Sequence, residues 1–183
     1  EFIAALKAKP KITFASAGIG TPGHFAGELL KLKFDENLTH VPYKGAGPAL
    51  NDLIGGHVDF NFSGFPAAAP HVRAGSLKLL ALSSAKRSPA APDVPTVAEV
   101  TGIKDYDFTL WAGVFAPRGT PQPVIDRLNK EINAVLAQAD VKARLEAAGA
   151  VVTPMSVSAF RAFVPRESAK YLHVIKETGV TAQ

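Results

Sequence analysis

Short apolar runs separated by glycine- or proline-containing turns make up the first half of the chain. Three of these runs have the length and composition of β-strands, and each is followed after a short loop by a segment with apolar residues at helical spacing. The strands are expected at residues 12–16, 39–42 and 58–62, and the helices at residues 22–33, 46–54 and 66–74. A strand–loop–helix unit repeated three times predicts a parallel sheet flanked by helices.

The pattern changes after residue 86, where the chain becomes rich in proline and then largely helical. Apolar residues recur at helical spacing over residues 121–148, and Ser156 and Gly179 are suited to begin and end a last helix. Further elements are expected as short helices at residues 2–9 and 97–100, and as strands at residues 77–82 and 108–115. We therefore expect an α/β domain at residues 1–117 and a helical segment at residues 118–183.

The composition is that of a globular protein, with 47% hydrophobic and 20% charged residues among 183. The formal net charge is +4, and the basic residues are scattered along the chain, so nucleic acid is not indicated as a partner. A mild positive field favours small anions instead. No apolar run approaches the roughly 20 residues that a membrane-spanning helix needs, so direct membrane insertion is not expected. Cysteine is absent.

The sharpest local feature is the glycine-rich loop between the first strand and the first long helix. A helix N-terminus presents unpaired N–H groups and partial positive charge, so it can hold an anion, and glycines let the backbone approach a ligand. The residues expected to bind are Ser16, Ala17, Gly18, Gly20, Thr21 and His24. Thr21 before Pro22 is also a typical helix start, so a plain turn with a capping threonine explains the same residues.

A dinucleotide site is the alternative reading of this loop. Gly18, Gly20 and Gly23 match the GxGxxG pattern of Rossmann-type oxidoreductases. That pattern needs an acidic residue after the second strand to hold the ribose, and the chain has Tyr43 and Lys44 there. A lysine can meet a 2′-phosphate, so NADP stays open as the cofactor of this alternative.

Two further loops should lie beside the glycine loop, because the carboxyl ends of parallel strands share one edge of the sheet. Tyr43 follows the second strand and Ser63 follows the third, and each brings a hydroxyl to this edge. The remaining histidines are interpreted as surface or packing residues; they are His40, His57, His71 and His173.

Catalytic patterns are not found in the sequence. Ser63 lies outside any GxSxG nucleophile motif, and no HxH or HxxxH pair suggests a metal site. We therefore expect a binding protein without catalytic residues, metal or cofactor.

Several segments read in order give the chain a family resemblance. They are Val41-Pro42-Tyr43-Lys44-Gly45, Gly47-Pro48-Ala49-Leu50-Asn51-Asp52-Leu53, Gly55-Gly56-His57-Val58-Asp59, Ser84-Ala85-Lys86-Arg87-Ser88-Pro89, Asp93-Val94-Pro95-Thr96-Val97-Ala98-Glu99 and Phe115-Ala116-Pro117-Arg118-Gly119-Thr120-Pro121. Together with the glycine loop, they resemble the substrate-binding receptors of tripartite tricarboxylate transporters, the Bug or TctC-like family. The resemblance covers essentially all 183 residues.

This resemblance implies a type II periplasmic-binding-protein fold that captures a small carboxylate (a di- or tricarboxylate, an acidic amino acid or an aromatic acid). It implies a periplasmic location and delivery of the ligand to the membrane permease of the transporter. The loop from Ser16 to His24 then corresponds to the carboxylate loop of the second domain, with Tyr43 and Ser63 beside it. The segment 118–183 corresponds to the return of the chain into the first domain, whose N-terminal part, with its signal peptide, is expected to be missing from this chain.

Overall fold

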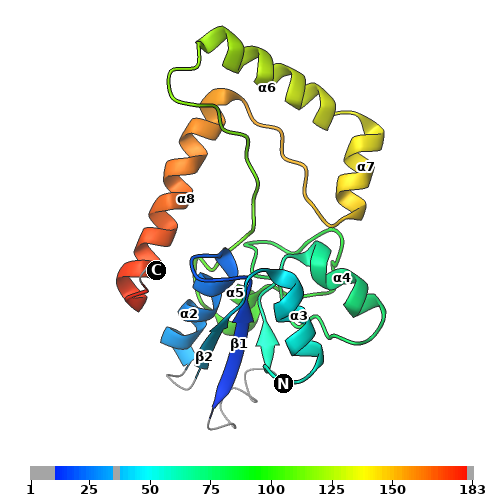
Figure 1. The fold of residues 1–183 in the computed structure, drawn as a ribbon, viewed down its shortest axis with the longest axis vertical. Coiled ribbons are helices and arrows are strands. Elements are labelled where there is room, and N and C mark those ends of the chain that lie inside the picture. The colour runs from blue at the N-terminus through cyan, green and yellow to red at the C-terminus, as the bar shows by residue number, and fades with distance from the viewer. Residues whose placement is uncertain (1–10, 35–37, 181–183) are drawn as a thin grey trace. The chain divides into compact units, whose positions relative to one another are not determined.

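The computed structural model describes residues 11–34 and 38–180, so the helix expected at residues 2–9 lies outside the described residues. Two compact units are present (Figure 1). The first comprises residues up to 110 together with the chain from residue 173, and the second comprises residues 111–172. Each unit is described by itself below.

The first unit is built on the parallel sheet that the sequence predicts. Its strands are β1 (Ile12–Ser16), β2 (Leu38–Pro42) and β3 (Phe60–Asn61), and their order is β2-β1-β3. Both neighbours run parallel to β1, and Ala15 pairs with Val41 on one side and with Asn61 on the other. All three strands therefore end at the same edge, where the three predicted loops begin.

Helix α2 (Pro22–Phe34) covers one face of this sheet at very short range. Phe14 is fully buried on that face and stacks on both His40 and Phe60. A Cβ atom on Gly27 would lie 2.0 Å from the Phe14 ring, so only glycine allows α2 to approach β1 this closely. Tyr106 anchors the same helix, since its hydroxyl donates to the Ala26 carbonyl at 2.8 Å.

Helix α3 (Ala46–Ile54) covers the opposite face, where Ala15, Ala49 and Val58 form a small buried cluster. Helix α4 (Phe65–Arg73) follows β3. The bounds of α2, α3 and α4 confirm the three predicted helices to within a residue. The alternation of faces along β1 thus places Phe14 and Ser16 toward α2 and Ala15 toward α3.

The expected strand at residues 77–82 is wrong in extent. The described chain there has no regular secondary structure apart from an isolated bridge between Leu82 and Thr96. Thr96 leads into the short helix α5 (Val97–Thr101). Leu77 and Leu79 are half-buried and Leu80 is exposed, so the segment lacks the neighbouring strand that would bury it.

The second unit contains α6 (Gln122–Leu136), α7 (Ala139–Ala147) and most of α8 (Val157–Thr178). The predicted helical region is confirmed, with a break at residues 137–138, and Ser156 caps α8 by accepting from the Ala159 N–H at 3.1 Å. The strand expected at residues 108–115 is wrong. Its aromatic residues contact α8 instead: Trp111 lies 5.1 Å from Phe163 and Phe115 lies 5.3 Å from Phe160, between ring centroids.

Candidate functional site

The glycine-rich loop leaves the buried end of β1 and folds back on itself before α2 begins. Gly18 and Gly20 have φ angles of 140° and 79°, which residues with a side chain rarely adopt. The Thr21 hydroxyl donates to the Gly18 carbonyl at 2.7 Å. Helix α2 starts after Thr21 as predicted, and this hydroxyl closes the loop onto Gly18.

Ser16 holds the base of the loop from inside the protein. Its side chain is fully buried, and its hydroxyl accepts from the Gly18 N–H at 3.2 Å. The same oxygen lies 3.1 Å from the Gly18 carbonyl and 2.7 Å from His40 Nε2. These contacts fill the hydrogen-bonding positions of the hydroxyl, so Ser16 shapes the base of the loop in this structure.

His24 holds the tip of the loop. It lies on α2 directly after the loop and is only 5% exposed. Its Nδ1 accepts a hydrogen bond from the Gly20 N–H at 3.2 Å. A neutral imidazole that accepts at Nδ1 must carry its proton on Nε2. Burial lowers the pKa of His24 below its usual value, which favours this neutral form.

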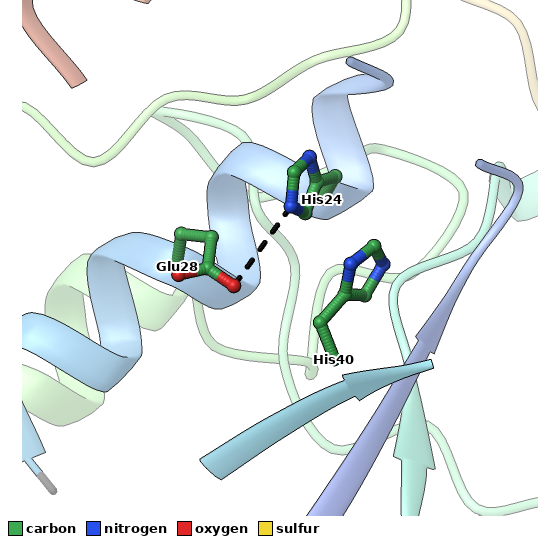
Figure 2. Close-up of side chains that lie close together, drawn as sticks. All are labelled: His24, Glu28 and His40. Carbon is green, nitrogen blue, oxygen red and sulfur yellow. Dashed lines mark ion pairs between the residues drawn. The ribbon is translucent and has the colours of Figure 1, made fainter. Parts of the chain in front are cut away.

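His40 lies beside His24 at the sheet, a placement that the sequence did not predict. Figure 2 shows His24 and Glu28 on α2 and His40 on β2, with their side chains close together. His24 Nε2 is 3.8 Å from Glu28 Oε1. Burial lowers the pKa of His40 to about 4, helped by the nearby His24 and Lys31, and burial raises the pKa of Glu28 against the attraction of Lys31.

The outer side of the loop keeps hydrogen-bonding capacity. The main-chain N–H groups of Ala17 and Ile19 have no acceptor among the residues that the structure describes. Ile19 is 40% exposed, and the first turn of α2 contains no acidic residue. Free N–H groups beside the N-terminus of a 13-residue helix are suited to an anion.

The backbone of Tyr43 lies alongside this loop and is hydrogen-bonded to it. The Tyr43 N–H donates to the Ser16 carbonyl at 3.1 Å, and the Gly45 N–H donates to the Ala17 carbonyl at 3.0 Å. The Tyr43 hydroxyl, however, donates to Asp52 Oδ2 on α3 at 2.6 Å, and this hydrogen bond raises the pKa of Tyr43. The phenol therefore braces the second loop against α3.

Ser63 and Asn61 bring unpaired polar atoms to the end of the third strand. The Ser63 hydroxyl and both polar atoms of the Asn61 amide are buried without a hydrogen-bond partner within the described chain. Buried polar groups nearly always have a partner, so such atoms point to a water or a ligand that completes them. Sequence reasoning missed Asn61; the available signal was an amide residue between two phenylalanines, Phe60 and Phe62.

His24, Glu28 and His40 are the group of possible metal ligands found within residues 11–34 and 38–180, and their ligand atoms lie within 4.8 Å of one another. Two observations argue against an ion. The Nδ1 of His24 accepts the Gly20 N–H, so its Nε2 carries a proton rather than a free lone pair. The two imidazoles are also stacked, with 19° between their planes, and their lone pairs do not converge on one point. We therefore do not assign these residues as metal ligands.

Comparison with known proteins places this chain in a family. A family model described as the tripartite tricarboxylate transporter family receptor matches residues 1–180. The chain belongs to this family. It is 36% identical over 178 residues to BugT of Bordetella pertussis (strain Tohama I), which covers 97% of this chain and 54% of BugT. It is also 40% identical over 150 residues to a protein of the tcbD–tcbE intergenic region of Pseudomonas sp. (strain P51), covering 81% of this chain and 45% of that protein.

Solved structures give the same result for the fold. The structure of Rpa4515 from R. palustris with adipate matches with a TM-score of 0.86 and 32% identity, over 98% of this chain and 60% of that one. The structure of MatC from Rhodopseudomonas palustris with bound malate matches with a TM-score of 0.77 and 32% identity, over 95% of this chain and 60% of that one. The periplasmic binding protein BugD matches with a TM-score of 0.82 and 33% identity, over 100% of this chain and 62% of that one.

These matches confirm the family resemblance and the periplasmic-binding-protein fold. They give no support to the Rossmann-type alternative. The chain spans about half the length of the curated relatives that it matches. No helix within the described residues is both long enough and apolar enough to cross a membrane.

Proposed function

We propose that the protein is an extracytoplasmic receptor that captures a small carboxylate and passes it to the membrane permease of a tripartite tricarboxylate transporter, without catalysing a reaction. The observation that carries this proposal is the pair of free N–H groups, at Ala17 and Ile19, on a loop that leads into the N-terminus of α2. Neighbours of this fold have adipate and malate bound, and BugD is a periplasmic binding protein. A periplasmic location of this chain is part of the same proposal.

The residues of the site divide into two roles in this proposal. Ala17 and Ile19 offer main-chain N–H groups to a ligand carboxylate, and Ser63 offers an unpaired hydroxyl from the next strand. Ser16, Gly18, Gly20, Thr21 and His24 hold the loop in shape through the hydrogen bonds among them. Tyr43 fixes the neighbouring loop. Because N–H and O–H donors are matched to oxygen anions, the expected ligand is a carboxylate rather than a cation.

We further propose that residues 118–183 belong to the first domain of a two-domain receptor. Helix α6 has a hydrophobic stripe, yet none of its residues is buried, and Val124, Leu128 and Val135 are each almost half exposed. Amphipathic helices normally cover their apolar stripe, so another part of a longer protein is the expected partner. The second wall of the ligand cleft would come from the same part.

The carboxylate proposal is tested by titrating adipate and malate into the isotope-labelled chain and following backbone amide signals by NMR. We expect the amides of Ala17, Ile19 and their neighbours to shift with dicarboxylate concentration. Dimethyl adipate is the matched control, since it keeps the carbon chain and removes both charges. Thr21→Val should weaken binding at least severalfold by opening the loop. Equal shifts with the ester, or shifts confined to other residues, would contradict the proposal.

The domain proposal is tested by Leu128→Lys on α6. In this chain the substitution should leave the free energy of unfolding nearly unchanged, because Leu128 is 47% exposed. In a longer form that carries the rest of the first domain, the same substitution should lower the unfolding midpoint, because it would bury a lysine in an apolar contact. Equal effects in the two forms would refute the proposal.

A further inference from the structure

The hydrogen bond between Gly20 and His24 joins the exposed tip of the ligand loop to a buried side chain. Gly20 is exposed, whereas His24 is 5% exposed, and the bond length is 3.2 Å. The other closing bonds of the loop, from Thr21 and from Ser16, end at Gly18. Among the described contacts, this bond is therefore the side-chain contact that holds Gly20 at the tip of the loop.

This bond depends on the protonation state of His24. The Gly20 N–H can only donate, so Nδ1 must present a lone pair, and the neutral ring then has its proton on Nε2. The next proton to bind can only go to Nδ1. Protonation would set an N–H against an N–H at 3.2 Å, and the loop tip or the ring would have to move.

The surroundings of the ring favour its neutral form. His40 on β2 stacks on it, with 4.1 Å between the ring centroids. On α2, Glu28 is 3.8 Å from Nε2 and 3.9 Å from the Lys31 ammonium group. From the segment after α5, Tyr106 contacts α2 through its hydroxyl. A Glu28 carboxylate would favour an imidazolium, but Glu28 is itself buried and shared with Lys31, and water is largely excluded from both.

We propose that His24 is a positioning residue that holds the loop 16–21 in its ligand-binding shape only while its imidazole is neutral, so that acid releases the loop and weakens carboxylate capture. This inference rests on the proposed function, since it concerns the same loop. The expected loss of affinity follows from the uptake of one proton. Below the pH at which His24 takes up this proton, the affinity for the carboxylate falls by at most about tenfold per pH unit.

Two substitutions of His24 separate its roles. In His24→Asn the amide oxygen occupies the place of Nδ1 and still accepts from Gly20, but it cannot be protonated. In His24→Leu the acceptor is lost at every pH. The dissociation constant for adipate would be measured for wild type and both variants at about pH 7 and at a lower pH, chosen below the midpoint at which the His24 ring protons titrate. Adipate itself gains protons over this range, but equally for all three proteins, so differences between them report the protein.

We expect His24→Asn to bind adipate like the wild type at the higher pH and to lose clearly less affinity at the lower pH. His24→Leu should bind severalfold more weakly at both. Without ligand, the Gly20 amide signal in wild type should follow pH with the same midpoint as the His24 ring protons, and it should stay constant in His24→Asn. A Gly20 signal that ignores the His24 titration would overturn the inference, as would identical pH dependence of wild type and His24→Asn. If neither adipate nor malate shifts the loop amides in a longer form that carries the second wall of the cleft, the proposed function fails, while the ligand-free titration still decides the role of His24.

Discussion

The imidazole ring of His40 lies nearly parallel to that of His24, with 4.1 Å between the ring centroids and 19° between the planes. Phe14 also stacks on His40, at 4.8 Å between centroids. The two histidines come from different elements, β2 and α2, and both connect to the glycine-rich loop, His40 through Ser16 and His24 through Gly20. A pair of stacked imidazoles beside this loop, each with its pKa lowered by burial, should make the stability of the domain depend on pH.

The first prediction concerns this pH dependence. The pKa of His40 is about 4 in the folded chain and about 6.5 when unfolded, so between these values the unfolded chain binds more protons. The free energy of unfolding should therefore fall as pH drops from about 6.5 to about 4, by about 2–3 kcal/mol for His40 alone after allowance for its partial exposure. The lowered pKa of His24 acts in the same direction, and the raised pKa of Glu28 opposes both.

Urea unfolding at a series of pH values checks this prediction. His40→Gln keeps a polar group near Ser16 but cannot titrate, so its stability should vary less with pH than that of the wild type. His57→Gln is the matched control, because His57 is exposed and lies outside the cluster. An unchanged pH slope in His40→Gln would show that the stacked pair is not the source of the acid sensitivity.

The second prediction concerns the close approach of α2 to the sheet. In Gly27→Ala the new Cβ would lie 2.0 Å from the Phe14 ring, and the buried helix and ring would have to separate. We expect a loss of about 1–3 kcal/mol in the free energy of unfolding, measured by chemical denaturation. Gly47→Ala on α3 is the control: nothing lies within 4 Å of its added Cβ, and the effect should stay within about 1 kcal/mol. Similar values for the two variants would contradict the packing argument.

The parallel sheet could be read from the sequence because its signals are local. Helix α2 begins at Pro22 and α3 ends before Gly55, and proline and glycine are residues that favour these helix boundaries. A repeated strand–helix order also leaves few possible topologies for the sheet. The glycine loop could be placed for the same reason. The aromatic-rich segment at residues 108–115 shows the limit. Apolar composition signals burial, but a strand needs a backbone partner, and here ring contacts from Trp111 to α8 take up the apolar surface.

The side chains behind the loop could not be predicted in this way. His24 is near the start of α2 and His40 is on β2, so most of α2 separates them in the sequence. The pairing of Phe14 with His40 across β1 and β2 brings the second histidine to the first. The direction in which the Asn61 side chain points also depends on strand register, since the pairing of Asn61 with Ala15 puts it on the α3 side of the sheet. Register between strands is set by the complete fold rather than by any single segment.

The third prediction concerns the Asn61 amide, whose two polar atoms are buried without partners in the described structure. An unsatisfied buried group costs about 1–3 kcal/mol, and valine is better suited to a strand. Asn61→Val should therefore raise the free energy of unfolding of the ligand-free chain by about 1 kcal/mol. Asn61→Asp keeps the shape but buries a charge, and it should be destabilising. A clear loss of stability in Asn61→Val would instead mean that a bound water satisfies the amide.

The last prediction concerns the capping box at the start of α5. The Thr96 hydroxyl accepts from the Glu99 N–H at 3.1 Å, and Glu99 accepts from the Thr96 N–H at 2.7 Å. Thr96 is 2% exposed and also forms the bridge to Leu82. Loss of the cap should therefore destabilise both the start of α5 and this bridge. We expect Thr96→Ala to cost about 1–2 kcal/mol in urea unfolding, and Thr96→Ser to recover most of this because it keeps the hydroxyl. Thr153→Ala is the control, since Thr153 is exposed and its hydroxyl makes only a long contact of 3.5 Å with the Val151 carbonyl. If Thr96→Ser proves as destabilising as Thr96→Ala, the threonine methyl group rather than the cap holds this region together.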